Sequence, residues 1–444
     1  MQPLIDKKIT ILGAARSGLA AARLLHKAGA RVFVSDQASI EIKAQEAAEL
    51  HQAGIDFEFG GHSAKAYDTQ LVVLSPGIPL RSEVVRPFLE KNIAVLSEVE
   101  VASWFCKAPI IAVTGSNGKT TTTTLIGEML RKEYPDAIVA GNIGQAFSDF
   151  VEQSNEHSWA VVELSSFQLE TIDTFHPRQA VVLNFAPNHL NRYDSYEDYL
   201  QAKWRVTRNI SARDYLIYNA ADALLTEWAG KTNCRKQGFH INGEQSYAAY
   251  CLDDALFINH EKFIETKEIG LRGKHNYMNA MAAILAASNA GVSPSHIREV
   301  LRSFRGVEHR LEEVAVKDGI TFINDSKATT VESLSFALQS FDNPVILIAG
   351  GQDKGSDFTT VNAVLKAHAK SIILIGSAAS KMEQAWHGLK PIYHEASLQD
   401  AVIRARSLAR EKDIVLLSPA CASFDMFKDF EDRGRQFKKI VESL

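Results

Sequence analysis

The sequence of 444 residues is poor in cysteine and contains only Cys106, Cys234, Cys251 and Cys421. These four show neither CxxC spacing nor a partner pattern with histidine, which argues against a disulfide framework and against a zinc site. We therefore predict free and mostly buried thiols. No base accompanies Cys421 in the sequence, and we do not expect a cysteine nucleophile there.

Long apolar runs and an excess of positive charge are also missing. No apolar run approaches the roughly 20 residues that a membrane-spanning helix needs, and no signal-peptide pattern opens the sequence. The net charge is -5, and no long basic stripe is available to neutralise the phosphates of a nucleic acid. The sequence predicts a cytoplasmic protein with neither a membrane span nor a nucleic-acid partner.

A glycine-containing turn stands out in the middle of the chain. Residues 110–113 form a short β-branched run, the turn Thr-Gly-Ser-Asn-Gly-Lys-Thr follows, and a helix is predicted from Thr121. In such a turn, backbone N–H groups and a helix N-terminus converge on a phosphate, while Lys119 reaches the β and γ phosphates and Thr120 ligates Mg²⁺. The two glycines are closer together than in the usual P-loop, so we expect a tighter loop. We predict ATP binding; an ordinary turn with a solvated lysine is the alternative.

The chain length and the alternation of strand-like and helical patterns predict an α/β protein of three domains. We place the domains at residues 1–98, 99–306 and 307–444. The first is expected to be Rossmann-like, the second to carry a mostly parallel sheet of the P-loop ATPase type, and the third to be a Rossmann-like, doubly wound sheet.

The N-terminal domain opens like a dinucleotide-binding fold. Its first apolar run ends in a glycine-containing turn, and the next strand ends in Asp36, where such folds place a ribose-binding acid. Ala15 replaces the middle glycine of GxGxxG, so NAD, another nucleotide and a purely structural turn all stay open. A later strand leads into Ser75 and Gly77, which are ligand candidates at the same edge of the sheet or simply turn residues.

Two further strand ends of the middle domain should lie at the edge that carries the turn. An apolar strand ends in Glu163, where a carboxylate can hold Mg²⁺ directly or through water; a solvated strand end is the alternative. The next strand runs into His189, which is either a metal or phosphate contact or a structural histidine. Lys203 lies on a helix that we expect Ser195 to cap, and its local sequence predicts only a solvated lysine.

Asn276 and Asn279 stand three residues apart in the first turns of a predicted alanine-rich helix. At this spacing the two side chains share one face of the helix. Their amides are suited to recognition of adenine, while capping of the helix N-terminus is the alternative.

In the C-terminal domain, three strand exits are rich in glycine and polar residues. Because the domain is expected to hold a mostly parallel sheet, these exits should meet at one edge. Lys327 and Lys354 on two of the exits suggest an anionic partner, unless both are independent surface lysines. The three exits are residues 324–329, 350–354 and 418–425.

Several motifs, spread over all three predicted domains, together resemble those of the Mur ligases. The run at residues 418–425 resembles, in particular, the members of this family that use D-glutamate. The motifs are Thr-Gly-Ser-Asn-Gly-Lys-Thr-Thr at 114–121, Glu-Leu-Ser-Ser-Phe-Gln-Leu at 163–169, Asn-His-Leu at 188–190, His-Asn at 275–276 with Asn-Ala at 279–280, His-Arg at 309–310, Asp-Ser-Lys-Ala-Thr at 325–329 and Ser-Pro-Ala-Cys-Ala-Ser-Phe-Asp at 418–425.

The resemblance implies a monomeric, ATP-dependent amide ligase of peptidoglycan precursor synthesis that uses two Mg²⁺ ions. Its substrates would be UDP-N-acetylmuramoyl-L-alanine and D-glutamate, joined through an acyl phosphate and a tetrahedral intermediate. A folylpolyglutamate synthase, an NAD-dependent oxidoreductase and a non-catalytic nucleotide-binding protein are the alternatives. Two positions depart from the family pattern, since Thr330 stands where Asn is expected and Arg16 lies in the uridine-binding loop.

The resemblance also implies a role for each matching residue. Catalytic roles would fall to Lys119, His189 and Lys203, and Lys203 would be carbamylated by CO₂. The expected metal contacts are Thr120, Glu163, His189 and Lys203; the expected ATP contacts are Gly115, Ser116, Asn117, Gly118, Lys119, Thr120, Thr121, Asn276, Asn279, Arg310 and Asp325; the expected UDP-sugar contacts are Asp36, Ser75, Gly77 and Asn142; and the expected D-glutamate contacts are Lys327, Thr329, Lys354, Ser423 and Phe424.

Overall fold

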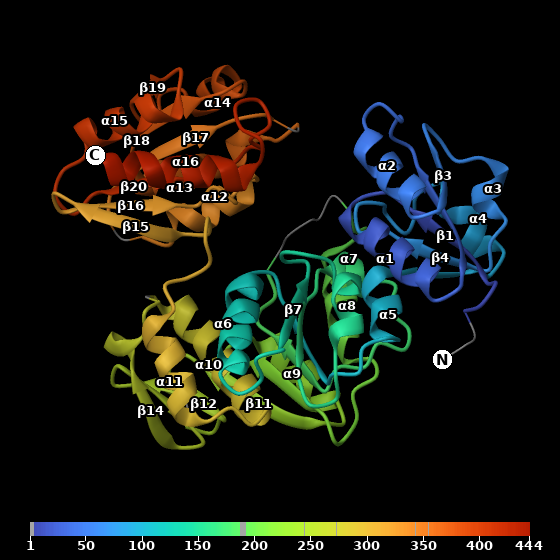
Figure 1. Cartoon of the computed structure of the whole chain (residues 1–444). Coiled ribbons are helices and arrows are strands. Elements are labelled where there is room, and N and C mark those ends of the chain that lie inside the picture. Colours follow the sequence, from blue (N-terminus) through green and yellow to red (C-terminus); the bar gives the residue numbers. More distant parts are fainter. Residues whose placement is uncertain (1–3, 187–191, 244, 272, 342, 354) are drawn as a thin grey trace. The chain divides into compact units, whose positions relative to one another are not determined.

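The computed structural model describes residues 4–186, 192–243, 245–271, 273–341, 343–353 and 355–444 (Figure 1). The chain divides into two compact units, Met1–Phe304 and Arg305–Leu444. The first unit contains a 5-stranded and a 9-stranded sheet, and the second contains a 6-stranded sheet. The predicted α/β class, with one sheet for each of three domains, is confirmed; the exact domain limits stay a prediction.

The N-terminal sheet is parallel throughout, with the strand order β3-β2-β1-β4-β5. The sheet is buried because its central strands are almost entirely apolar, and α1 packs an alanine- and leucine-rich face against it. The elements are β1 (Lys8–Leu12), α1 (Arg16–Lys27), β2 (Arg31–Asp36), α2 (Ala44–Gln52), β3 (Asp56–Phe59), α3 (Ala64–Tyr67), β4 (Leu71–Leu74), α4 (Arg86–Glu90), β5 (Ala94–Ser97) and α5 (Glu98–Ser103).

The middle sheet has the order β14-β13-β12-β11-β10-β9-β6-β8-β7, parallel from β7 to β12 and antiparallel from β12 to β14. Its elements are β6 (Ile110–Thr114), α6 (Lys119–Arg131), β7 (Ile138–Gly141), η1 (Phe147–Asp149), η2 (Val151–Gln153), β8 (Ala160–Glu163), α7 (Ser166–Leu169), β9 (Gln179–Val182), α8 (Tyr196–Trp204), η3 (Arg205–Thr207), β10 (Tyr215–Asn219), α9 (Ala223–Lys231), β11 (Arg235–His240), β12 (Ala249–Leu252), β13 (Ala255–Ile258), β14 (Glu261–Glu265), η4 (Thr266–Glu268), α10 (Lys274–Asn289) and α11 (Pro294–Ser303).

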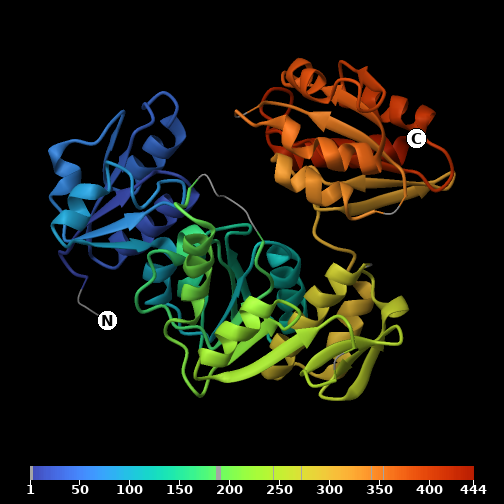
Figure 2. The same ribbon diagram turned by 180° about the vertical axis from the view of Figure 1, so that it is seen from behind.

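Helices cover both faces of the middle sheet. One apolar core includes side chains of α6, α10 and α11, and the other includes side chains of α5, η1, α7 and α9. Figure 2 shows the same layers from behind. The strands β6, β8 and β9 are neighbours, and therefore their carboxyl ends, which carry the predicted site, lie side by side.

The C-terminal sheet has the order β15-β16-β20-β17-β18-β19, and only the edge strand β15 is antiparallel to its neighbour. Helices α12, α13 and α14 cover one face, while α15 and α16 cover the other. The elements are β15 (Glu312–Lys317), β16 (Ile320–Asn324), α12 (Val331–Leu338), β17 (Val345–Gly350), η5 (Phe358–Val361), α13 (Asn362–His368), β18 (Ala369–Ile375), α14 (Ala379–Trp386), β19 (Ile392–His394), α15 (Leu398–Leu408), β20 (Ile414–Leu417) and α16 (Phe430–Ser443).

Two expectations from the sequence need correction. The phosphate-loop helix begins at Lys119, two residues earlier than predicted, so Lys119 and Thr120 belong to its first turn. The four thiols are free, but only Cys421 is buried and the other three are half-buried, because they lie at the margins of the apolar cores. Among the described residues, the helices are too short or too polar to cross a membrane.

Candidate active site

The loop between β6 and α6 is built by two glycines with left-handed backbone angles. Gly115 has φ 146° and Gly118 has φ 79°, a region that side chains with a Cβ rarely adopt. A Cβ at Gly118 would lie only 2.3 Å from Oδ1 of Asn279. Glycine at position 118 therefore allows the side-chain amide of Asn279, on helix α10, to lie directly against the loop.

Two lysines converge on this loop. The Nζ atom of Lys119 donates to the carbonyl oxygens of Gly115 and Ser116, both at 2.9 Å. The Nζ atom of Lys203, which lies in the last turn of α8, donates to the same Gly115 oxygen at 2.9 Å. Two lysine side chains on one carbonyl make this an electropositive site, which favours a negatively charged ligand.

Lys203 is 2% exposed, so the expectation of a solvated lysine is wrong. Its Nζ atom lies 4.7 Å from the ring centre of Tyr199. Burial and the charge of Lys119 hold the pKa of Lys203 well below its ordinary value, and the charge of Glu163 opposes them. Desolvation therefore favours the neutral amine, which is the nucleophilic form of a lysine.

Glu163 lies at the end of β8, directly beside Val113 of β6. Its side chain is 2% exposed, which rules out a solvated strand end. One carboxylate oxygen accepts a hydrogen bond from Asn142 Nδ2 at 3.1 Å, while Oε2 is buried and has no hydrogen-bond partner among the described residues. A buried carboxylate oxygen without a partner is unfavourable unless a cation binds it.

Helix α10 presents the two predicted asparagines to the same loop. Gly273, and not an asparagine, is the N-cap residue of α10, so the capping alternative is wrong. Asn279 Nδ2 lies 3.4 Å from Asn276 Oδ1, and Asn279 is buried. The two amides therefore form one polar patch next to the phosphate loop, as their spacing predicted.

In the N-terminal domain, Asp36 and Ser75 meet at the turn that follows β1. Asp36 accepts hydrogen bonds from the N–H groups of Ala14 at 2.7 Å and Ala38 at 2.8 Å. The buried Ser75 hydroxyl donates to Gly13 O at 2.8 Å, while a Cβ at Gly77 would meet open space. These contacts fix the turn.

Asn142 follows β7 in the middle domain and contacts Glu163. Arg16, one of the two departures from the family pattern, donates a hydrogen bond to Gly144 O in the same middle-domain loop. Both residues therefore connect the loop after β7 with a neighbouring predicted site. The remaining predicted metal contact, His189, lies outside the described residues.

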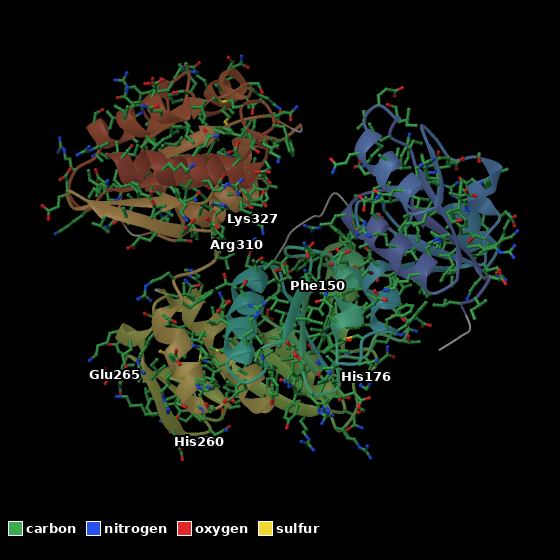
Figure 3. All side chains as sticks on the ribbon, viewed as in Figure 1. Phe150, His176, His260, Glu265, Arg310 and Lys327 are labelled. Atoms are coloured by element: carbon green, nitrogen blue, oxygen red, sulfur yellow. The ribbon has the colours of Figure 1, made fainter. Side chains whose placement is uncertain are left out.

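The second unit carries the other predicted residues, and its three polar strand exits meet as expected. Strands β16, β20 and β17 are neighbours, Ala420 N donates to Ala328 O at 2.9 Å, and Gln352 N donates to Ala422 O at 2.8 Å. Arg310 and Lys327 lie at the same edge of this unit (Figure 3), where Lys327 N donates to His309 O at 3.0 Å. Lys354 lies outside the described residues.

Asp325 is buried at the centre of this edge. It accepts hydrogen bonds from Ser418 Oγ at 2.9 Å and from Leu311 N at 3.2 Å. Burial raises its pKa to about 7, and the Ser418 hydrogen bond and the charge of Arg310 oppose the rise. The carboxyl group can therefore change its protonation state near neutral pH.

The candidate D-glutamate residues surround this edge with different exposures. Ser423 is buried, Thr329 is half-buried, and Phe424 is 63% exposed. The Lys327 ammonium lies 5.6 Å from the ring centre of Phe430. Thr330 accepts a hydrogen bond from Ser333 N at 3.3 Å and caps α12, a role that asparagine fills equally well, so this departure from the family pattern keeps the helix cap.

Sequence reasoning missed Arg433, which is completely buried in α16. Its guanidinium donates to Ser326 Oγ at 2.9 Å, to Ser326 O at 2.8 Å and to Cys421 O at 3.2 Å. It thus joins the loop after β16 to the loop after β20. The sequence shows only a charged residue in a helix, and its burial depends on the packing of α16.

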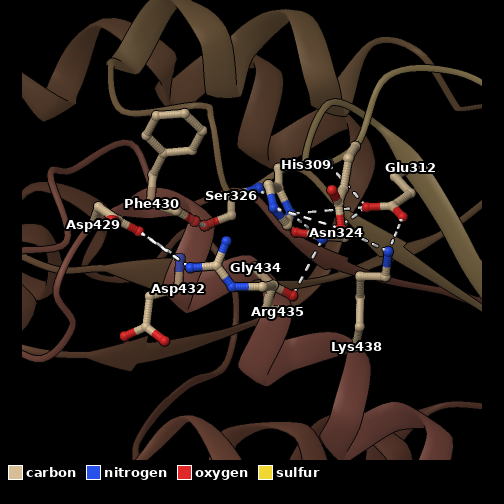
Figure 4. A network of polar contacts seen from close by, with 11 residues as sticks. His309, Glu312, Asn324, Ser326, Asp429, Phe430, Asp432, Gly434, Arg435 and Lys438 are labelled. Carbon is tan, nitrogen blue, oxygen red and sulfur yellow. Dashed lines mark hydrogen bonds and ion pairs between the residues drawn. The ribbon is translucent and has the colours of Figure 1, made fainter. Parts of the chain in front are cut away.

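A second polar network holds the loop that carries Arg310 (Figure 4). His309 has a left-handed backbone with φ 64° and is buried; Asn324 Nδ2 lies 2.9 Å from its Nδ1 and 3.0 Å from Glu312 Oε2. The Lys438 ammonium bonds Glu312 at 2.6 Å and neutralises that carboxylate. Glu308, His309 and Glu312 lie close enough together to bind a cation, but Lys438 already supplies the positive charge.

Comparison with known proteins shows similarity to Mur ligases in all three domains. Residues 8–84 match the MurD N-terminal domain, residues 113–287 the Mur ligase middle domain, and residues 309–421 the glutamate ligase domain of Mur ligases. A UDP-N-acetylmuramoylalanine–D-glutamate ligase of Salinibacter ruber is 43% identical over 452 residues, covering 98% of each chain. The ligase of the same name from Chloroherpeton thalassium is 41% identical over 460 residues, covering 99% of this chain and 98% of its own.

Solved structures show the same fold. The UDP-N-acetylmuramate–alanine ligase MurC of Thermotoga maritima aligns with 98% of this chain and 99% of its own, with a TM-score of 0.61 and 20% sequence identity. The fold, the converging side chains at the phosphate loop and relatives above 40% identity over nearly the full length agree with one another. The chain belongs to the Mur ligase family.

Proposed function

We propose that this chain is the ATP-dependent ligase that joins D-glutamate to UDP-N-acetylmuramoyl-L-alanine and releases ADP and phosphate. The cluster of Lys119, Glu163 and Lys203 around the Gly115 carbonyl carries the proposal, because it combines positive charge with a buried carboxylate at a phosphate loop. The full-length similarity to relatives that bear the ligase name supports the choice of substrates. A cytoplasmic location and a monomeric state stay predictions.

The residues at the phosphate loop fit Mg²⁺. Glu163 offers an unpartnered, buried oxygen, and the buried Thr120 offers a hydroxyl in the first turn of α6, which are the hard oxygen ligands that this ion prefers. Thr120 and Glu163 would hold the ion, which when bound neutralises charge on the transferred phosphoryl group. His189 and a second ion stay predictions.

We assign Lys203 as the carbamylated lysine. Its neutral amine would attack the carbon of CO₂: the N–C bond would form as one C=O π bond opens onto its oxygen, and the nitrogen would release a proton to solvent, so that the neutral amine becomes an anionic carbamate. The lowered pKa of Lys203 supports the first step, because only the unprotonated amine has the required lone pair. The new carboxylate would satisfy the positive charge of Lys119 and add oxygen ligands for a metal.

The order of reaction follows from the chemistry of an amide ligase. The carboxylate of the UDP-linked substrate attacks the γ phosphate of ATP, ADP leaves, and the amine of D-glutamate then displaces phosphate from the acyl carbon. Lys119 stabilises charge on the transferred phosphoryl group. Arg310 and Asp325, with Asn276 and Asn279, are assigned to ATP.

We assign the remaining residues to the other two substrates, following the resemblance. The UDP-sugar contacts are Asp36, Ser75, Gly77 and Asn142, and the D-glutamate contacts are Lys327, Thr329, Lys354, Ser423 and Phe424.

Phosphate release from ATP, measured with each substrate alone and with both, tests the proposal. We expect release that needs both substrates and that Lys119→Ala abolishes. Lys132→Ala is the matched control, because Lys132 lies just beyond the other end of α6 and pairs with Glu299 on the surface. Release with a folate acceptor and not with the UDP-linked substrate would replace the substrate assignment, and no release with any acceptor would refute the enzyme assignment.

A further inference from the structure

Arg192 connects two regions that the proposed reaction uses separately. Its guanidinium donates to Pro76 O and, at 3.0 Å, to Ile78 O, both in the loop after β4. The same guanidinium stacks on Phe167, with its central carbon 3.8 Å from the ring centre. One planar side chain of the middle domain is thereby fixed between a loop of the N-terminal domain and the start of α7.

The N-terminal end of this connection reaches the turn assigned to the UDP-sugar. Ser75, next to Pro76, bonds Gly13 O, and a Cβ at Gly13 would lie 3.2 Å from Cδ1 of Ile78. A shift of the residues held by Arg192 would therefore change the packing around Gly13. The position of the loop and the shape of the turn are coupled by direct contact.

The other end reaches the phosphate loop through aromatic side chains. Tyr193 stacks on Phe167 with ring centres 6.1 Å apart and meets Tyr199 edge-on at 5.5 Å. The Tyr199 hydroxyl lies 2.9 Å from Ser116 Oγ, and its ring faces Lys203. Tyr199 is completely buried, so this contact cannot be exchanged for one with water.

We propose that Arg192 is a positioning residue that couples binding of the UDP-linked substrate at the N-terminal turn to binding of ATP at the phosphate loop. The inference rests on the proposed function, which supplies the two ligands. A planar guanidinium can donate to two carbonyls and stack on a ring at the same time, whereas an ammonium cannot stack. The contacts that lead from Pro76 through Arg192 and the aromatic side chains to Ser116 therefore form a continuous packed series. Through this series, ligand binding at one site can affect ligand binding at the other.

A purely structural role makes a different prediction. If Arg192 only stabilised the fold, its loss would lower the unfolding midpoint and the amount of active enzyme, while the KM values and the mutual effect of the two ligands would be unchanged. If it couples the sites, the affinity for one ligand must depend less on the other, and by the same factor in both directions.

The test compares Arg192→Met and Arg192→Lys with wild type. Arg208→Met is the matched control, because Arg208 also donates to a backbone carbonyl, Ile172 O at 3.0 Å, and pairs with Asp173, outside the proposed connection. The Kd of a non-hydrolysable ATP analogue is measured by calorimetry with and without UDP-N-acetylmuramoyl-L-alanine, and steady-state rates give kcat and the KM of each substrate.

We expect the UDP-linked substrate to tighten analogue binding in wild type and in Arg208→Met. In Arg192→Met this tightening should fall about tenfold or vanish, with a raised KM for the UDP-linked substrate; Arg192→Lys should restore it only in part. Unchanged coupling in Arg192→Met would overturn the inference, even if stability fell. Absence of turnover in wild type would instead overturn the proposed function, and the coupling with it.

Discussion

Replacement of Glu98 by glutamine should make the protein more stable at alkaline pH. Glu98 opens helix α5 and is 1% exposed. Its Oε1 accepts a hydrogen bond from Ser148 N at 2.6 Å, while its Oε2 and the Ser148 hydroxyl are buried without partners among the described residues. Glutamine keeps the shape and the accepting oxygen, and it replaces the unpartnered oxygen by a neutral donor.

The magnitude follows from the pKa of Glu98. Burial, with a smaller contribution from Asp149, raises this pKa from 4.5 to about 7, while the hydrogen bond from the Ser148 backbone N–H and the charge of Arg16 oppose the rise. Because the folded-state pKa is raised, the contribution of Glu98 to stability is complete below pH 4.5 and is lost as the pH rises through 7. At about 1.36 kcal/mol per pKa unit, the loss amounts to roughly 3 kcal/mol.

Urea unfolding followed by tryptophan fluorescence, at a series of pH values from 4.5 to 8.5, measures this difference. Glu98→Gln should match wild type at the acidic end and exceed its free energy of unfolding by about 2–3 kcal/mol at the alkaline end. Other titrating groups, such as Asp325, are present in both proteins and cancel in the difference. A difference that does not change with pH, or that has the opposite sign, would refute the reasoning.

Glu100, which lies two residues after Glu98 in α5, is the matched control. It is also completely buried, but its two oxygens accept from Trp104 Nε1, from the backbone N–H groups of residues 173, 174 and 175, and from the Thr174 hydroxyl. An amide in its place would point a donor at two N–H groups. Glu100→Gln should therefore destabilise the protein by about 2–4 kcal/mol.

Three further predictions concern other buried groups. Arg433→Met should destabilise the second unit by about 2–4 kcal/mol, seen as a lower unfolding midpoint, because the carbonyls of Ser326 and Cys421 lose their donors; an unchanged midpoint would contradict this. Cys421→Ala should leave turnover intact and native protein should resist iodoacetamide at this site, since burial raises the pKa of the Cys421 thiol to about 12; rapid labelling at pH 8 would show otherwise. Removal of CO₂ should lower the rate and bicarbonate should restore it in wild type but not in Lys203→Arg; a rate indifferent to CO₂ would remove the carbamate from the mechanism.

Much of the fold could be predicted because its strands are short, apolar and bounded by turns. The strand around Val113 lies where its β-branched run indicated, and so do the apolar strands that lead into the first glycine-containing turn and into Ser75. The edge strand β19 has only three residues, and neither its length nor its half-buried pattern distinguishes it from a loop. Edge strands of this kind depend on pairing with a neighbour, which a local pattern does not contain.

The site was predictable wherever a strand end supplied the residue, as for Glu163 and Asp325. It was not predictable where burial depends on contacts with other segments. Lys203 is enclosed by the loop that contains Gly115 and by Tyr199. Arg433 is enclosed by the loop that contains Ser326, about a hundred residues away in sequence, and by the loop that contains Cys421. The sequence predicts a solvent-exposed side chain for a lysine or arginine on a helix, because it does not show which distant residues contact that side chain.

The contact between Gly118 and Asn279 has a consequence for protein engineering. The width of the phosphate loop is set by a helix that lies far downstream in the sequence, since a Cβ at Gly118 would collide with the Asn279 amide. Grafting the segment from Gly115 to Thr121 onto another α/β scaffold would transfer the glycines but not Asn279 of helix α10, against which Gly118 packs. A successful graft has to bring a counterpart of α10 with it.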